Sequence, residues 1–156
     1  MKTRTIIALL IAIAVLAGAY IVFRSFFAEV PMQPATGVSV GQVSDYAEGD
    51  VKHFPDHKLF VVCRDGKLFA VSSLCTHMKC ETDWAPAENE FKCSCHGSKF
   101  DKDGNVLNPP ADKPLPRFAI EDNGSGGLFV DTARTSGNSD DWGKAPYFVE
   151  AAGQGR

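Results

Sequence analysis

The chain has 156 residues, of which 44% are hydrophobic and 22% charged, enough for one small domain with appended segments but not for a large enzyme. Charge is divided unevenly: Lys2, Arg4 and Arg24 are the charged residues of the first 24, which leaves 13 basic and 19 acidic residues, a net charge of −6, for the remainder. This acidic remainder excludes a basic nucleic-acid groove, so we expect no nucleic-acid partner. Five cysteines are too few for a disulfide-dense mini-protein and more than an ordinary cytosolic domain of this size contains.

The first expected element is a transmembrane α-helix. Thr5–Phe23 contains nineteen residues without a charge, which as a helix would extend about 28 Å, close to the thickness of the hydrocarbon core. We therefore expect a single-pass anchor over residues 1–27 that contacts the lipid bilayer. Lys2 and Arg4 favour a cytoplasmic N-terminus. The rest of the chain would then lie on the periplasmic side of the inner membrane, where disulfides persist.

A cleavable signal peptide is the alternative interpretation of this segment. Lys2 and Arg4 would form its basic region, and Ala17-Gly18-Ala19 matches a cleavage site. The apolar run continues past that site to Phe23, which favours the uncleaved anchor.

Residues 28–41 follow as a predicted hinge or tether. Pro31, Pro34, Gly37 and Gly41 interrupt the segment, and no helical or strand period is present. Such a tether would let a head domain move over several nanometres. The alternative is a short ordered segment that leads into the first strand.

Residues 42–134 form the predicted head domain, and their pattern is all-β. Lys58–Cys63 and Leu68–Val71 are short apolar runs on either side of Asp65-Gly66, a typical hairpin turn. Further strands are expected at Glu90–Lys92, Lys99–Phe100, Arg117–Ile120 and Leu128–Asp131. We expect a small antiparallel sandwich or open barrel, in which long loops need additional cross-links.

Two segments of the head domain contain four of the five cysteines and two of the four histidines: Cys75-Thr76-His77-Met78-Lys79-Cys80 and Cys93-Ser94-Cys95-His96-Gly97-Ser98. A metal centre needs thiolate and imidazole groups that converge from separate loops, and Cys-x-His together with Cys-x-x-His supplies two such pairs. A structural zinc site is the alternative use of these residue types.

The double motif C-T-H-x-x-C and C-x-C-H-G-S strongly resembles the Rieske iron–sulfur proteins, over roughly Leu59 to Val130. The resemblance implies a Rieske-type fold with two cluster-binding loops and a [2Fe–2S] cluster. Cys75 and Cys93 would bind one iron, and His77 and His96 the other. Replacing two thiolates by neutral imidazoles raises the reduction potential, so that a quinol can act as donor.

By the same resemblance, Cys80 and Cys95 form a disulfide that joins the two loops, and Ser98 donates its hydroxyl to a bridging sulfide. The extra cysteine pair resembles the high-potential branch of the family, which serves quinol-oxidising complexes. Phe100 stands where a tyrosine is common, which predicts a lower potential. Asn108-Pro109-Pro110-Ala111 corresponds to the proline-rich loop that shields the cluster, with Asn108 in place of the usual glycine.

The resemblance implies the electron-transfer subunit of a membrane quinol:cytochrome c oxidoreductase of the cytochrome bc type, part of a multi-subunit enzyme. Its partners would be quinol and cytochrome subunits with b-type and c-type haems. Quinol would hydrogen-bond to a cluster histidine, His96 or His77, with His96 favoured. The alternatives are a Rieske subunit of a periplasmic molybdenum oxidase resembling arsenite oxidase, and a Rieske ferredoxin that serves an oxygenase.

Residues outside the motifs have simpler interpretations. Cys63 shares a strand face with Leu59 and Val61 and is expected to be a core thiol. His53 and His57 flank Pro55 in a loop-like segment and are expected to be solvated.

Residues 135–156 are rich in Gly, Ser, Asn and Asp and are expected to form a C-terminal tail. Such tails are usually disordered. The alternative is that Trp142, Tyr147 and Phe148 dock on a partner subunit.

Overall fold

The computed structural model describes residues 13–23 and 37–151. The chain divides into two compact units, residues 1–32 and 33–156, which we treat separately. In the first unit, residues 13–23 are helical. The predicted span over Thr5–Phe23 begins outside the described residues, and no helix within the described part is long and apolar enough to cross a membrane.

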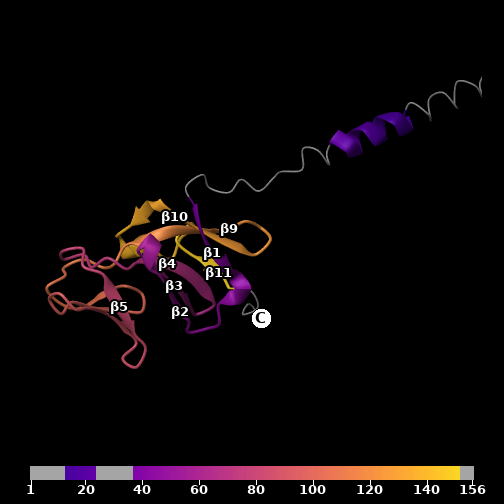
Figure 1. Ribbon diagram of the computed structural model, residues 1–156. Helices are drawn as coiled ribbons and strands as arrows, with labels where there is room; N and C mark the ends of the chain where they lie inside the picture. Colours follow the sequence, from indigo (N-terminus) through magenta and orange to yellow (C-terminus); the bar gives the residue numbers. More distant parts are fainter. Residues whose placement is uncertain (1–12, 24–36, 152–156) are drawn as a thin grey trace, which may run out of the picture. The chain divides into compact units, whose positions relative to one another are not determined.

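The second unit is built from two antiparallel sheets, as its sequence pattern predicts (Figure 1). The larger sheet has the order β1-β10-β9-β4-β3-β2, and β11 also pairs with β4. Its strands are β1 (Gly37–Gln42), β2 (Val51–Phe54), β3 (Leu59–Arg64), β4 (Lys67–Ser72), β9 (Arg117–Asp122), β10 (Gly127–Ser136) and β11 (Val149–Glu150).

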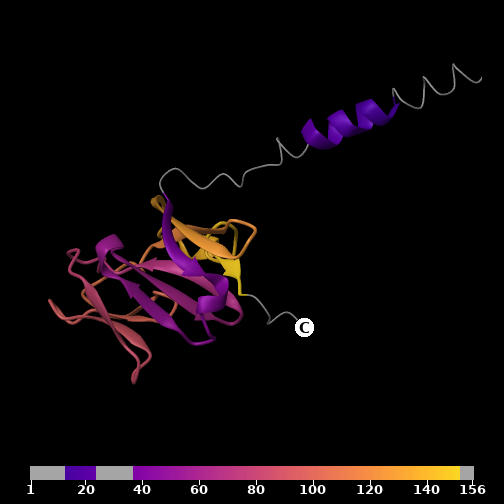
Figure 2. The ribbon, with the colours of Figure 1, turned by 45° about the vertical axis from the view of Figure 1, so that its right-hand side comes forward.

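The smaller sheet has the order β5-β6-β7-β8 and lies to one side of the larger sheet in both views (Figures 1 and 2). Its strands are β5 (Thr82–Ala85), β6 (Glu90–Cys93), β7 (Lys99–Asp101) and β8 (Val106–Asn108). Helical turns in this unit are short 3-10 segments: η1 (Val43–Asp45), η2 (Pro55–His57) and η3 (Ser139–Asp141). The strands that the sequence predicts are confirmed. The sequence pattern does not predict five further strands: β1, β2, β5, β8 and β11.

The hairpin of β3 and β4 separates two hydrophobic cores. Successive strand residues point to opposite faces, so Leu59, Val61 and Cys63 enter the first core, while Phe60 and Val62 enter the second. The turn between the strands places Asp65 and Gly66 at φ values of 53° and 70°, as the sequence predicts for a tight Asp-Gly hairpin. Cys63 is buried among apolar side chains, and the prediction of a core thiol is confirmed.

The second core underlies the metal-binding motifs. Cys75 and Cys93 belong to it, together with fully buried phenylalanines of β3, β6 and β7: Phe60, Phe91 and Phe100. Rings in this core pack closely: those of Phe60 and Phe91 are tilted by 40° with centroids 4.9 Å apart. Packing in the second core therefore fixes both cysteines at the points where their loops begin.

The two ends of the predicted head domain extend further than the sequence pattern indicates. Residues 37–41, placed in the predicted tether, belong to β1, whereas 28–36 lie outside the described residues. At the other end, β10 continues to Ser136, and Val149 pairs with Leu68 in β4. The backbone N–H of Ile120 donates to the carbonyl of Pro146 at 2.8 Å.

Trp142 fastens this C-terminal segment to the domain. Its ring is buried and lies against the Arg117 guanidinium, which also contacts the Phe69 ring; the Arg117 Cζ atom is 4.5 Å from the Trp142 ring centroid and 3.6 Å from that of Phe69. Asp103 pairs with Arg117 at 3.2 Å, and burial lowers the pKa of Arg117 to about 10. The segment expected to be a disordered tail thus packs on its own domain up to residue 151.

We expect Trp142→Ala to lower the free energy of unfolding by about 3–5 kcal/mol, the usual cost of removing a buried Trp side chain. Chemical denaturation of the full chain measures this change. Lys144→Ala is the matched control in the same segment, because Lys144 is exposed, and its effect should stay within about 0.5 kcal/mol. Equal effects of the two variants would contradict the assignment of Trp142 as the fastening residue.

Candidate metal centre

The first motif forms a tight loop between β4 and β5. The backbone N–H of Cys75 donates to the carbonyl of Cys80 at 2.8 Å, and Lys79 N–H donates to the Cys75 carbonyl at 2.9 Å. Cys75 is buried, while His77 is exposed. The loop therefore keeps its first thiol inside the domain and presents its imidazole at the surface.

The second motif repeats this arrangement between β6 and β7. The backbone N–H of Cys93 donates to the carbonyl of Ser98 at 2.9 Å, and Gly97 N–H donates to the Cys93 carbonyl at 3.0 Å. Gly97 has a φ of 81°, a conformation that favours glycine. Cys93 is buried and His96 is exposed, so this loop divides its donor groups as the first one does.

A disulfide between Cys80 and Cys95 joins the two loops, and the predicted pairing is confirmed. Cys80 closes the first loop, while Cys95 lies within the second. The sulfur atoms of both lie within 4.8 Å of the Cys93 sulfur. Because their thiols are consumed in the disulfide, these two cysteines brace the centre and do not supply thiolate ligands.

The structure brings the four predicted donors together as two pairs. The Cys75 and Cys93 thiols are in hydrogen-bonding contact, and burial raises the pKa of Cys93, an effect that the Cys75 thiol reinforces. Backbone N–H groups of Cys95 and His96 donate to the Cys93 sulfur and oppose this increase. The His77 and His96 rings have centroids 5.0 Å apart and are nearly perpendicular.

The proline-rich segment is hydrogen-bonded to both loops. Thr76 Oγ1 donates to the carbonyl of Lys113 at 2.6 Å, and Ala111 N–H donates to Ser98 Oγ at 3.0 Å. Because Ser98 is fully buried and its oxygen accepts from Ala111, its hydroxyl proton remains available for a donor bond within the centre. The sequence does not predict this hydrogen bond of Thr76, because its partner is 37 residues away in the chain.

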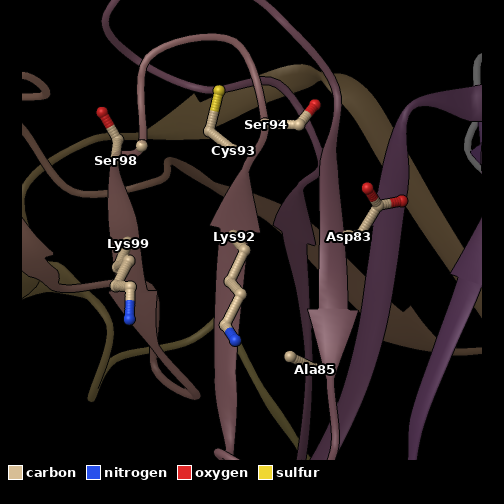
Figure 3. Close-up of a pocket in the computed structure, with 8 residues that line it drawn as sticks. Asp83, Ala85, Lys92, Cys93, Ser94, Ser98 and Lys99 are labelled. Carbon is tan, nitrogen blue, oxygen red and sulfur yellow. The ribbon is translucent and has the colours of Figure 1, made fainter.

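A recess of about 390 Å³ lies beside the second loop (Figure 3). Its lining comes from β5, β6, β7 and the loop after β6: Asp83, Ala85, Lys92, Cys93, Ser94, Gly97, Ser98 and Lys99. Lys92 and Lys99 extend along the same face of the small sheet, and both pair with Glu90, at 3.5 and 2.9 Å. Neither histidine of the motifs is among the lining residues, so the recess and the imidazole pair are separate features.

A charged cluster that sequence reasoning missed borders the first loop. Glu81, next to Cys80, accepts from Lys58 Nζ at 2.9 Å, and this bond is the main cause that lowers the pKa of Glu81. His53 Nε2 lies 3.3 Å from the same carboxylate, and its ring stacks on Phe60 with a centroid distance of 4.2 Å. His53 and His57 are exposed, as predicted, but His53 also contacts the domain.

The donor set, two buried thiols and two exposed imidazoles, fits an iron–sulfur centre with mixed cysteine and histidine ligation. Residues 36–119, just over half of the chain, match the family model described as the Rieske [2Fe–2S] domain. The chain belongs to this family, and its cofactor is a Rieske-type [2Fe–2S] cluster. The zinc alternative is thereby disfavoured.

Several relatives of this chain are iron–sulfur subunits of cytochrome b6-f complexes. The Chlorobaculum tepidum subunit is 37% identical over 86 residues, 54% of this chain and 48% of that protein. The Nostoc sp. subunit 1 is 47% identical over 47 residues, 30% of this chain and 26% of that protein. The match thus spans about half the length of the Chlorobaculum relative.

Among solved structures, the plasma membrane Rieske protein of Synechocystis PCC 6803 is 35% identical, with a TM-score of 0.48, and the match covers 60% of this chain and 97% of that one. A chain of a hyperthermophilic respiratory complex III is 24% identical, with a TM-score of 0.47, and the match covers 81% and 98%.

We expect the double variant Cys80→Ser with Cys95→Ser to lose about 3 kcal/mol of unfolding free energy, because the disulfide closes a segment with a sequence separation of 15 residues. Urea denaturation with and without a strong reductant measures this loss. Reductant should destabilise the parent chain and the control Cys63→Ala, but not the double variant. Equal reductant sensitivity in all three proteins would contradict a stabilising role of the disulfide.

Proposed function

We propose that Cys75 and Cys93 hold one iron of the cluster and that His77 and His96 hold the other. The burial of the residues supports this division, since both thiols belong to the second core and both imidazoles lie at the surface. The buried thiolates keep one side of the centre away from water, while the imidazoles present the other side to a reaction partner. When bound, the cluster supplies one-electron oxidation and reduction.

We further propose that the exposed imidazole pair binds quinol, and this exposure is the observation that carries the proposed function. A ligand imidazole keeps one ring nitrogen free, and that nitrogen can accept a hydrogen bond from a quinol hydroxyl and then take its proton. His96 is the favoured acceptor and His77 the second candidate. Electron transfer from the quinol is thereby coupled to transfer of its proton.

The surroundings of the imidazoles suit an apolar docking partner. Within residues 37–151, the large hydrophobic side chains that are more than half exposed are Met78 and Leu107, at 64% and 56%. Met78 follows His77, and Leu107 precedes the proline-rich loop that bonds to Ser98. We propose that these two side chains contact the apolar surface of a membrane-embedded, b-type cytochrome subunit.

The chain would therefore act as the Rieske subunit of a membrane quinol:cytochrome c oxidoreductase of the bc type, passing its electron to a c-type haem. The disulfide supports a head domain on the periplasmic side, because disulfides persist in oxidising compartments. Residues 1–27 would anchor the subunit in the inner membrane, and residues 28–36 would serve as the tether. Most of these residues lie outside the described part of the chain.

Isolation of the full chain from its native membranes tests the choice of partner. A b-type cytochrome that co-purifies, together with quinol-dependent reduction of cytochrome c, is the expected result. A molybdopterin subunit in its place would identify a molybdenum oxidase. Recovery from the soluble fraction with an oxygenase would identify a ferredoxin. Either of these two results would overturn the proposed subunit.

We expect each of Cys75→Ser, Cys93→Ser, His77→Ala and His96→Ala to abolish the EPR signal of the reduced two-iron cluster. Cys63→Ala should retain the signal, because Cys63 lies in the first core, away from the loops. Iron and acid-labile sulfide content are measured on the same samples. If one of the four variants kept the full iron content and the parental EPR signal, the replaced residue would not be a ligand.

We expect Phe100→Tyr to raise the midpoint potential and Ser98→Ala to lower it, each by about 65–130 mV, the scale of one hydrogen bond to a charged group in a one-electron couple. Both side chains are fully buried next to the second loop. The first variant adds a hydroxyl, and the second removes one. Ser94→Ala is the matched control, since Ser94 is exposed in the same loop. A redox titration in which Phe100→Tyr shows no increase would refute the role given to position 100.

A further inference from the structure

Asn108 is the last residue of β8 and joins the proline-rich loop to the second cluster loop. Its Nδ2 donates to the Gly97 carbonyl at 3.0 Å and to the Pro109 carbonyl at 2.9 Å. The second bond is local, whereas the first connects residues that are eleven positions apart. Asn108 is not among the residues with positive φ, so its backbone does not require glycine and accommodates the side chain without strain.

The bond to Gly97 acts on a peptide group at a sensitive point of the loop. The carbonyl of Gly97 and the N–H of Ser98 share one rigid plane. The proline-rich loop bonds to this peptide group and to the side chain that follows it, because Asn108 donates to the Gly97 carbonyl and Ala111 donates to Ser98 Oγ. Along the chain, this peptide group links Gly97, which follows His96, to Ser98, whose hydroxyl is buried.

Gly97 itself contributes little restraint. It is exposed, and a side chain added at this position would meet no other heavy atom within 4 Å. The Gly97 N–H is bonded within the loop, to Cys93, while the bond from Asn108 reaches its carbonyl from a different segment. A glycine restricts its backbone less than other residues do, so the bond from Asn108 adds a restraint at the Gly97 carbonyl to those that the loop makes at the Gly97 N–H and the Ser98 carbonyl.

We infer that Asn108 is a positioning residue for the cluster: its side-chain amide fixes the Gly97–Ser98 peptide, and through it the orientation of His96 and of the Ser98 hydroxyl. This inference rests on the proposed ligand role of His96. The alternative is that Asn108 only stabilises its own turn through the bond to the Pro109 carbonyl. Replacing Asn108 would then leave the cluster unaffected.

The test compares Asn108→Leu, which keeps the approximate volume and removes the donor, and Asn108→Asp, which offers only acceptors to the Gly97 carbonyl. Asn105→Leu is the matched control, because Asn105 lies in the same hairpin and donates to Asp101 at 2.9 Å. The readouts on the purified, cluster-containing full chain are the EPR g values of the reduced state and the rate of cluster loss on warming. Urea denaturation of each variant reports general destabilisation.

We expect both Asn108 variants to show altered g values and cluster loss about two- to tenfold faster, the factor that corresponds to one neutral hydrogen bond. Asn105→Leu should keep the parental g values. The inference would be overturned if Asn108→Leu kept the parental g values and lost its cluster at a rate within twofold of the parent. It would also be overturned if the g values were parental and the faster loss only matched the lower unfolding free energy. In both cases the proposed ligand set would still stand. A parent chain without the two-iron signal would overturn the proposed ligand set together with this inference.

Discussion

The hairpin of β3 and β4 is buried on both faces, and the rest of the head domain is arranged around it. Its alternating side chains separate two cores, one beneath the larger sheet and one beside the smaller sheet. The second core contains Cys75 and Cys93, where each motif loop begins. Without this shared wall, the short strands of the small sheet would have no packed surface against which to hold the loops.

The two loops repeat one design on this base. In each, hydrogen bonds between the first and last residues close a turn that buries a thiol and exposes an imidazole. The disulfide links the two turns, and the proline-rich segment is hydrogen-bonded to them through Thr76 and Ser98. This division places two thiols inside the domain and two imidazoles at its surface, as the proposed ligand set requires.

The C-terminal segment illustrates where sequence patterns mislead. Its Gly, Ser, Asn and Asp content is that of a disordered tail, yet Trp142 packs on Arg117 and Val149 pairs with Leu68. These contacts involve residues 25 and 81 positions apart, so no local pattern reports them. The sequence pattern does not predict the short strands β2, β5 and β8, although it does predict β6 and β7, which are equally short, so alternation over three or four residues is an uncertain signal.

The sequence by itself determined the type of centre in this protein: Cys75, His77, Cys93 and His96, the ligand set that we propose, stand at the spacing of a mixed thiolate and imidazole centre, and residue type and loop spacing are local properties. It also determined the all-β class and the β3–β4 hairpin, which depend on strand alternation and an Asp-Gly turn. Only the tertiary structure decided which side chains hold the loops in place. The contacts of Asn108 with Gly97 and of Thr76 with Lys113 join residues 11 and 37 positions apart, and the contact of Trp142 with Arg117, which fastens the C-terminal segment, likewise forms only on folding.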